Sequence, residues 1–160
     1  MKRFLFSLLV LGVLLIGGCT NIPKYQYDYS YTVVKDNKNY NVDVVNYNER
    51  GVLVSVKNNT DDVIEIDWNG SNISGSNIFM GGQKYIDAGK PIPSTVIAPQ
   101  GTVQKELYRA DSVSYSSYGW SVGYMGYPVE LILKVIVNGK AEFEVIRLNR
   151  EVIMLDSVKN

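Results

Sequence analysis

The segment "VELILKVIVNGKAEFEVIRL", residues 129–148, decides the fold class that the sequence predicts. Its first part, 129–137, is almost entirely apolar and rich in β-branched residues, which is typical of a central strand covered on both faces. Asn138-Gly139 is a pair that two-residue hairpin turns prefer, because both residues tolerate a positive φ angle. Residues 141–148 should then pair back along the first strand. The segment therefore predicts an antiparallel hairpin inside a β-sheet.

The segment 25–33 alternates strictly, with an apolar or aromatic residue at every second position: Tyr25, Tyr27, Tyr29, Tyr31 and Val33. A period of two is the pattern of a strand with one aromatic face and one polar face. We interpret the tyrosines as rings that pack on the domain with their hydroxyl groups at its rim. The alternative is a row of rings that stack on sugars or on a partner.

Further strands are predicted at 39–47, 52–57, 63–68, 78–86, 95–97, 103–110 and 151–155. Residues 69–77 are rich in Asn, Gly and Ser and are expected to form a loop. Beyond the first 18 residues, the sequence shows no convincing apolar repeat at the helical period of 3.6. The sequence therefore predicts an all-β domain, built as an antiparallel β-sandwich.

The order of features between residues 50 and 150 resembles immunoglobulin-like domains of bacterial envelope proteins. The features are the valine-rich strand 52–57, the turn "NNTDD", the lead-in "IAPQG" and the closing hairpin 129–148. The paired cysteines and the tryptophan spacing of antibody domains are missing. The resemblance implies an immunoglobulin-like sandwich and says nothing about activity.

The N-terminal segment has the layout of a secretory signal peptide. Lys2 and Arg3 form a positive region, and residues 4–16 form an apolar region. As a helix, about 13 residues rise roughly 20 Å, which is short of the roughly 30 Å hydrocarbon core of a bilayer. The segment is therefore expected to direct export and then to be removed.

The apolar region ends in Ile16-Gly17-Gly18-Cys19, which contains the single cysteine of the chain. This sequence resembles the lipobox of bacterial lipoproteins, in which an aliphatic residue and two small residues precede a cysteine. The resemblance implies a diacylglycerol on the Cys19 sulfur, cleavage just before Cys19, and an acyl chain on the new amine. Two or three acyl chains anchor a protein stably in a membrane.

Lipidation would divide the chain into a signal peptide (1–18), a lipidated cysteine with a short tether (19–24) and a β-sandwich domain (25–160). The expected location is the cell envelope. In a cell with two membranes, Thr20 in place of the aspartate that usually retains such proteins implies the outer membrane, facing the periplasm. In a cell with one membrane, the protein would lie on its outer face.

Composition excludes several classes of function. The chain has 16 basic and 16 acidic side chains, so nucleic-acid binding has no electrostatic support. It also has no histidine, which excludes Ser-His-Asp triads, Cys-His dyads and His-ligated zinc. We expect no resident metal or cofactor apart from the acyl chains, and no catalytic activity.

An aromatic segment rich in serine and glycine is the best candidate for a recognition surface. Its candidate binding residues are Tyr115, Tyr118, Trp120, Tyr124 and Tyr127. Tyrosine and tryptophan give a large contact area at a low cost in conformational entropy. The same composition also suits a hairpin whose rings cover the core.

Two groups of carboxylates are interpreted as solvated. Asp61, Asp62, Glu65 and Asp67 surround one turn but lack the spacing of a calcium loop. Glu142 and Glu144 lie two residues apart, hence on one face of a strand, and are expected on its outer, wet face.

These observations favour a membrane-anchored lipoprotein whose non-catalytic domain binds or supports an envelope protein or glycan. One alternative is an envelope hydrolase that uses carboxylate or Ser-Lys chemistry. Another is a phage-exclusion or inhibitor lipoprotein. A deep pocket with two convergent carboxylates would favour the hydrolase, and an exposed aromatic patch would favour binding.

Overall fold

The computed structural model describes residues 24–34, 37–82 and 90–155. The expected signal peptide, Cys19 and the tether up to residue 23 lie outside the described residues. Within the described ranges the regular elements are strands, apart from one 3-10 helix, η2 (Ala110–Ser112). In this part of the chain, no helical segment combines the length and the apolarity needed to span a bilayer. The prediction of an all-β fold is confirmed.

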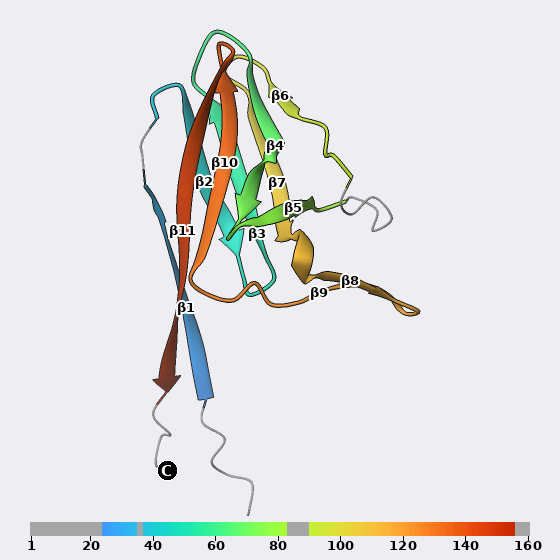
Figure 1. Ribbon diagram of the computed structural model, residues 1–160. Helices are drawn as coiled ribbons and strands as arrows, with labels where there is room; N and C mark the ends of the chain where they lie inside the picture. Colours follow the sequence, from blue (N-terminus) through green and yellow to red (C-terminus); the bar gives the residue numbers. More distant parts are fainter. Residues whose placement is uncertain (1–23, 35–36, 83–89, 156–160) are drawn as a thin grey trace, which may run out of the picture. The chain divides into compact units, whose positions relative to one another are not determined.

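The strands are β1 (Lys24–Val33), β2 (Tyr40–Tyr47), β3 (Gly51–Asn58), β4 (Ile64–Ile73), β5 (Ser76–Met80), β6 (Thr95–Ile97), β7 (Thr102–Arg109), β8 (Val113–Ser116), β9 (Gly119–Val122), β10 (Val129–Val137) and β11 (Lys140–Leu155). Nine of them form one sheet in the order β1-β11-β10-β4-β5-β7-β3-β2, with β6 paired to β4 (Figure 1). The pairings from β11 through to β2 are antiparallel. Strands β8 and β9 form a separate hairpin.

The chain consists of two compact units. The larger unit is Tyr29–Arg150 and contains the sheet core. The smaller unit contains the first residues of β1 and the last residues of β11, of which residues 24–28 and 151–155 are described. In this smaller unit Tyr25 and Tyr27 are exposed, as are Val152 and Ile153.

Strand β5 joins two groups of strands into one continuous sheet. One group is β1-β11-β10-β4, and the other is β7-β3-β2. Asn72 and Ile73 of β4 pair with its first residues, and Arg109 of β7 pairs with Ile78 in its middle. The segment 69–77, expected to be a loop, is therefore mostly strand, with a tight turn at Ser74-Gly75. Asn, Gly and Ser occur there because the chain forms an irregularity in β4 and then a hairpin, both of which need such residues.

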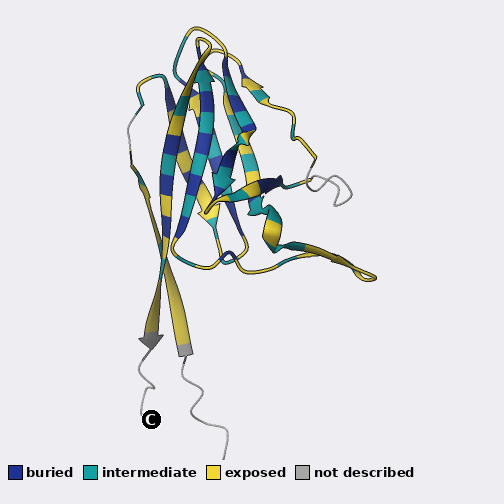
Figure 2. Cartoon of the chain, in the orientation of Figure 1, coloured by how far each residue is buried: buried dark blue, intermediate teal, exposed yellow. Residues whose placement is uncertain are grey.

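The core lies between these two groups of strands. Valines of β3, isoleucines of β4 and leucines of β10 belong to one buried cluster. The alternation of buried residues along these strands appears as dark blue bands in Figure 2. The largest side chain in this cluster is Trp68, whose indole N–H donates a hydrogen bond to Thr95 Oγ1 at 2.9 Å. Because β3, β4 and β10 each bury one face, the register between the strands of the core is strongly specified.

The predicted hairpin at 129–148 is confirmed. The prediction that its first strand is covered on both faces is wrong, because only one face is buried. Asn138 and Gly139 have φ angles of 49° and 73°, and Val137 pairs with Lys140 across the turn. Along β10, every second residue is buried and the others are only partly buried. On the second face, Lys134 reaches across to Asp67 at 2.9 Å. The other residues of this face, Glu130, Ile132 and Ile136, are likewise only partly buried.

The expectation that Glu142 and Glu144 face solvent is wrong. They lie opposite Val135 and Leu133, on the inner face of the hairpin, and Glu144 is 2% exposed. Phe143, between them, is 54% exposed. The turn at 138–139 determines the register, and that register places the polar residues inside and the phenylalanine outside.

Candidate functional site

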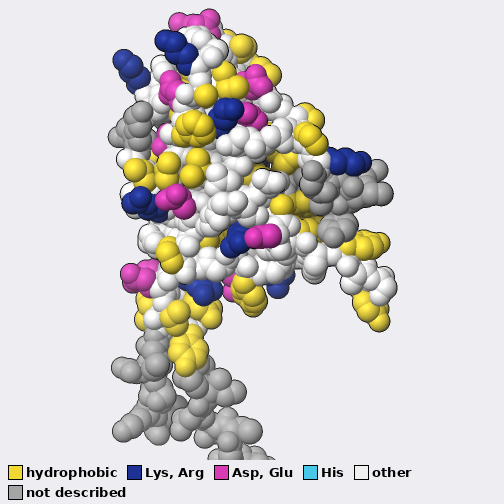
Figure 3. All heavy atoms as spheres, in the orientation of Figure 1, with side chains coloured by type: hydrophobic (Ala, Val, Ile, Leu, Met, Phe, Trp, Pro, Cys, Tyr) yellow, Lys and Arg dark blue, Asp and Glu magenta, His cyan; other side chains and the backbone are white. Residues whose placement is uncertain are grey.

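The aromatic residues expected to form a recognition surface have three different environments. Tyr115, Tyr118 and Tyr124 are largely exposed, and Trp120 is half exposed. Tyr127 is partly buried. Strands β8 and β9 place Tyr115 directly opposite Trp120, so these two rings share one face of the hairpin. Figure 3 shows hydrophobic side chains at the end of this hairpin, at the lower right of the view.

Trp120 packs against two aromatic side chains of the main sheet. Its ring lies 6.1 Å from the Phe79 ring and 6.3 Å from the Tyr108 ring, measured between centroids. Phe79 and Tyr108 are cross-strand partners on β5 and β7. Phe79 is 1% exposed but does not belong to the main core cluster. We call Phe79, Tyr108 and Trp120 the aromatic triad. Phe79 and Tyr108 hold the half-exposed Trp120 in a defined position.

A groove of about 350 Å³ lies beside the aromatic triad. Its volume is within the range of roughly 300–1,000 Å³ that small-ligand sites occupy. The lining residues come from the β2–β3 turn, β7 and β9: Asn48, Arg50, Glu106, Tyr108, Trp120, Ser121 and Val122. The groove thus combines two aromatic rings with one carboxylate, one guanidinium, an amide and a hydroxyl group.

The turn between β2 and β3 positions the cationic side of the groove. The Asn48 side-chain oxygen accepts hydrogen bonds from the backbone N–H groups of Arg50 and Gly51, at 2.8 and 3.2 Å. Such an Asx turn is why asparagine favours this position. Gly51 lies under the Tyr108 ring, where a Cβ atom would be 2.6 Å from two ring carbons. A glycine is therefore needed for the ring to lie flat on the strand.

Tyr108 and Glu106 point to the same face of β7, because they are two residues apart. Burial, followed by hydrogen bonding to and the charge of Glu106, raises the pKa of Tyr108 to about 12. The phenol therefore stays neutral at physiological pH and remains a hydrogen-bond donor. Glu106 is exposed and lies against Gly81, where a Cβ atom would come within 2.9 Å of its Oε2.

Tyr127 belongs to a second aromatic cluster, in which its partners are side chains of the larger unit and not of the groove. Its ring packs edge-on against Tyr29, at 6.1 Å, and the Arg150 guanidinium lies 5.1 Å from its centroid. Its hydroxyl group donates a hydrogen bond to the Asn48 carbonyl oxygen. Burial is the main cause that raises the pKa of Tyr127 above its ordinary value, and the neighbouring Tyr29 and Tyr47 raise it further. Tyr127 therefore supports the β2–β3 turn, which in turn carries Arg50.

Of the two inner carboxylates, Glu144 lines a different, smaller cavity of about 200 Å³. Glu144 borders it together with Tyr40, and Glu142 accepts a hydrogen bond from Asn37 Nδ2. Burial, together with the charges of Glu144 and Glu142, raises the pKa of the Tyr40 hydroxyl. Since Tyr40 is 1% and Glu144 2% exposed, these groups belong to the interior of the unit.

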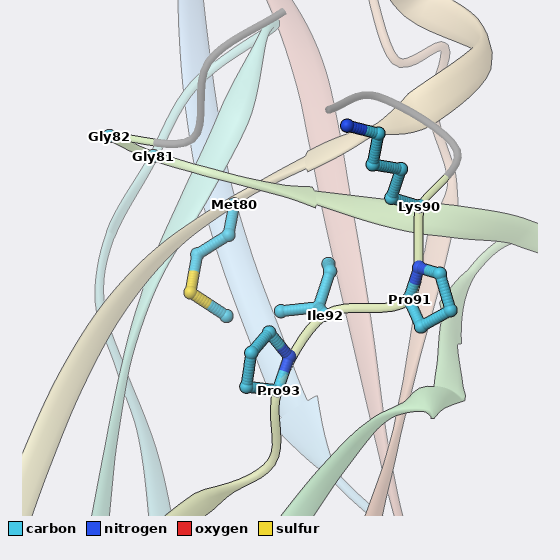
Figure 4. A pocket seen from close by; sticks show the side chains of 7 residues that line it. All are labelled: Met80, Gly81, Gly82, Lys90, Pro91, Ile92 and Pro93. Carbon is cyan, nitrogen blue, oxygen red and sulfur yellow. The ribbon is translucent and has the colours of Figure 1, made fainter. Parts of the chain in front are cut away.

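A third hollow, of about 420 Å³, lies between the end of β5 and residues 90–93 (Figure 4). Met80, Ile92 and Pro93 give it an apolar character, and Lys90 lies at its border. Residues 83–89, which connect the two lining segments in the sequence, lie outside the described residues. Among the described lining residues, aromatic side chains belong to the groove beside the aromatic triad and not to this hollow.

Comparison with known proteins does not assign the chain to a family. No protein-family model matches it, and no curated protein matches it.

Sequence reasoning identified only Trp120 among the groove residues. Phe79 and Tyr108 belong to the segments 78–86 and 103–110, which were expected to be strands without a functional role. The alternation of Glu106 and Tyr108 with Lys105 and Leu107 indicates an outward-facing pair. Phe79 lies next to Tyr108 because β5 pairs with β7. This pairing joins distant segments, so the residue pattern within one strand does not predict it.

Proposed function

We propose that the protein is a bacterial lipoprotein whose β-domain binds another component of the cell envelope without catalysing a reaction. The observation that carries this proposal is the half-exposed Trp120, held by Phe79 and Tyr108 beside an open, polar groove. An aromatic side chain fixed before binding loses little conformational entropy on binding. Residues of this type dominate the binding energy of many interfaces.

The lining of the groove supports binding over catalysis. Glycoside hydrolysis typically uses two carboxylates that flank the bond to be cleaved. Among the described lining residues, Glu106 is the one carboxylate, and Arg50 offers the opposite charge. Such a set can orient a ligand through hydrogen bonds.

The lipobox supports the location. In this proposal Cys19 carries a diacylglycerol and an N-acyl chain, and the domain is an immunoglobulin-like variant of the β-sandwich. A short tether after Cys19 would keep the domain near the membrane surface, since five residues span at most about 17 Å. The groove would then meet envelope proteins or glycans close to that membrane.

The anchor and the binding role are tested separately. Intact-mass analysis of the membrane fraction should find residues 19–160 with added acyl chains, and Cys19→Ala should abolish this species.

Cross-linking in intact cells tests the binding role. It should give a product for the wild type that is lost in the Trp120→Ala variant. Phe143→Ala, which removes an exposed ring from β11, is the matched control and should retain the product. An unlipidated wild type that keeps residues 1–18 would refute the anchor, and a product unaffected by Trp120→Ala would refute the binding surface.

A carboxylate hydrolase is the second candidate. The observation that favours it is the inward position of Glu142 and Glu144, of which Glu144 borders a cavity of about 200 Å³ together with Tyr40. Release of reducing sugar ends from purified envelope glycan by the wild type, but not by Glu144→Gln, would establish it. With Glu144 2% exposed, we expect no such release.

A further inference from the structure

We propose that the groove beside the aromatic triad binds a neutral oligosaccharide, with Trp120 as the surface on which a pyranose ring stacks. This inference rests on the proposed binding function and names the class of ligand. The groove residues that carry it are Trp120, Glu106, Arg50 and Asn48.

The first argument is the match between the tryptophan and a pyranose ring. One face of a pyranose presents C–H groups, and the π face of an aromatic ring is electron-rich, so the two surfaces attract each other. Trp120 is 50% exposed, and its contacts with Phe79 and Tyr108 fix the orientation of the indole. A sugar can therefore stack on a platform that exists before it binds.

The second argument is the polar lining. The hydroxyl groups around a pyranose ring both donate and accept hydrogen bonds. Glu106 offers two acceptor oxygens, Arg50 offers donors, and the Tyr108 phenol is neutral because its pKa is about 12. A purely apolar ligand would displace water from these groups without replacing its hydrogen bonds, and would therefore bind poorly.

The third argument is charge. Glu106 and Arg50 line the same groove with opposite charges, so neither sign of ligand is strongly favoured. A phosphate or carboxylate ligand would meet the Glu106 carboxylate, and a cation would meet Arg50. Neutral sugars avoid both conflicts.

The fourth argument concerns ligand length. Tyr115 lies directly opposite Trp120 on the same face of the β8–β9 hairpin and is 63% exposed. A second ring next to the first offers a place for a second sugar unit. The arrangement therefore suits a chain of sugars better than a monosaccharide.

The test uses the full-length lipoprotein in detergent and two uncharged tetrasaccharides, chitotetraose and maltotetraose. Intrinsic fluorescence reports on binding, because Trp120 is half exposed while the other tryptophan, Trp68, is 1% exposed. At least one tetrasaccharide should bind in a saturable manner and shift the emission. Calorimetry should show that Trp120→Ala raises the dissociation constant by about tenfold or more, as for other tryptophan hot spots.

Three variants separate recognition from folding. Trp120→Phe keeps a ring on Phe79, so it should fold like the wild type and still bind more weakly. Glu106→Gln should weaken binding severalfold because it removes a charged acceptor. Phe143→Ala, on β11, should bind like the wild type.

The outcomes distinguish this inference from the proposed function. If neither tetrasaccharide binds, and the Trp120-dependent cross-link in cells remains, the sugar assignment is overturned while the binding function stands. If the cross-link is also independent of Trp120, both are overturned. Binding that Trp120→Ala and Trp120→Phe leave unchanged would likewise overturn the assignment to this groove.

Discussion

Single residues decide how the two faces of the sheet are used. Lys134 faces outward from β10, and its ammonium group lies 2.9 Å from Asp67 Oδ2. Asp67 Oδ1 also accepts hydrogen bonds from the backbone N–H groups of Asn69 and Gly70, at 3.1 Å each. The carboxylate thereby satisfies donors at the point where the pairing of β4 with β10 shifts register.

Asp67 gives the first prediction, which concerns acid stability. Hydrogen bonding to Lys134 is the main cause that lowers the pKa of Asp67 below its ordinary value of 3.8. The carboxylate therefore contributes stability that is fully present above the unfolded-state pKa and is lost as the pH falls through the lower, folded-state pKa. Asp67→Asn should reduce stability near neutral pH and also flatten the loss of stability on acidification.

The measurement is urea denaturation at about pH 6 and about pH 2.5, a range that includes the titration of most carboxylates. The exposed turn residue Asp61 supplies the control, and Asp61→Asn should leave the acid sensitivity nearly unchanged. An equal loss of stability on acidification in the wild type and Asp67→Asn would contradict the prediction.

At the scale of elements, the pairing of β3 with β7 supports the candidate site. Gly51, the first residue of β3, lies opposite Tyr108 in the register. The ring covers the glycine, in the position that a side chain would otherwise fill. Tyr108 in turn supports Trp120, so one cross-strand pair connects the sheet to the β8–β9 hairpin.

Gly51→Ala is the second prediction. Its Cβ would lie 2.6 Å from the Tyr108 ring and 3.0 Å from the Leu107 carbonyl oxygen, and the backbone oxygen cannot move away as a flexible side chain could. Overpacking of this kind costs about 1–3 kcal/mol, which thermal denaturation should detect. Because the ring must shift, the fluorescence of Trp120 should change as well.

Gly123→Ala is the control for this substitution. Its Cβ would meet only the Ser112 carbonyl oxygen, at 3.4 Å, so the change should be close to neutral. If Gly51→Ala is as stable as Gly123→Ala and has the same emission spectrum, Tyr108 does not lie on Gly51 as described.

At the scale of the larger unit, β5 connects the strands that a sandwich would place in two sheets. It pairs with β4 on one side and with β7 on the other, and one core cluster includes residues from both groups. Neither group of strands has a buried face without the other. We therefore expect the unit Tyr29–Arg150 to unfold as one cooperative system.

The third prediction tests this cooperativity. In a Trp120→Phe variant, the remaining tryptophan fluorescence, excited selectively over that of the tyrosines, comes from Trp68, which lies in the core and is 1% exposed. The denaturation curve followed by Trp68 fluorescence should coincide with the curve followed by the circular dichroism signal of the strands. A Trp68 transition that clearly precedes or follows the loss of strand signal would show that the two groups of strands unfold separately.

The sequence by itself determined the all-β class, the hairpin at 129–148 with its turn at Asn138-Gly139, and an aromatic segment with a tryptophan. These are local properties, because residue alternation and turn chemistry act over a few residues. Only the tertiary structure decided which face of each strand is buried. Glu144 is inside and Phe143 outside because the register, and not the polarity of each residue, places them.

The groove also depends on tertiary structure. Asn48, Glu106 and Trp120 are far apart in the chain and meet through the pairing of β3, β5 and β7 and the position of the β8–β9 hairpin. The residue pattern within a single strand does not predict which distant strand it pairs with. The sequence therefore predicted one ring of the site, and the sheet topology supplied the groups that make it a groove.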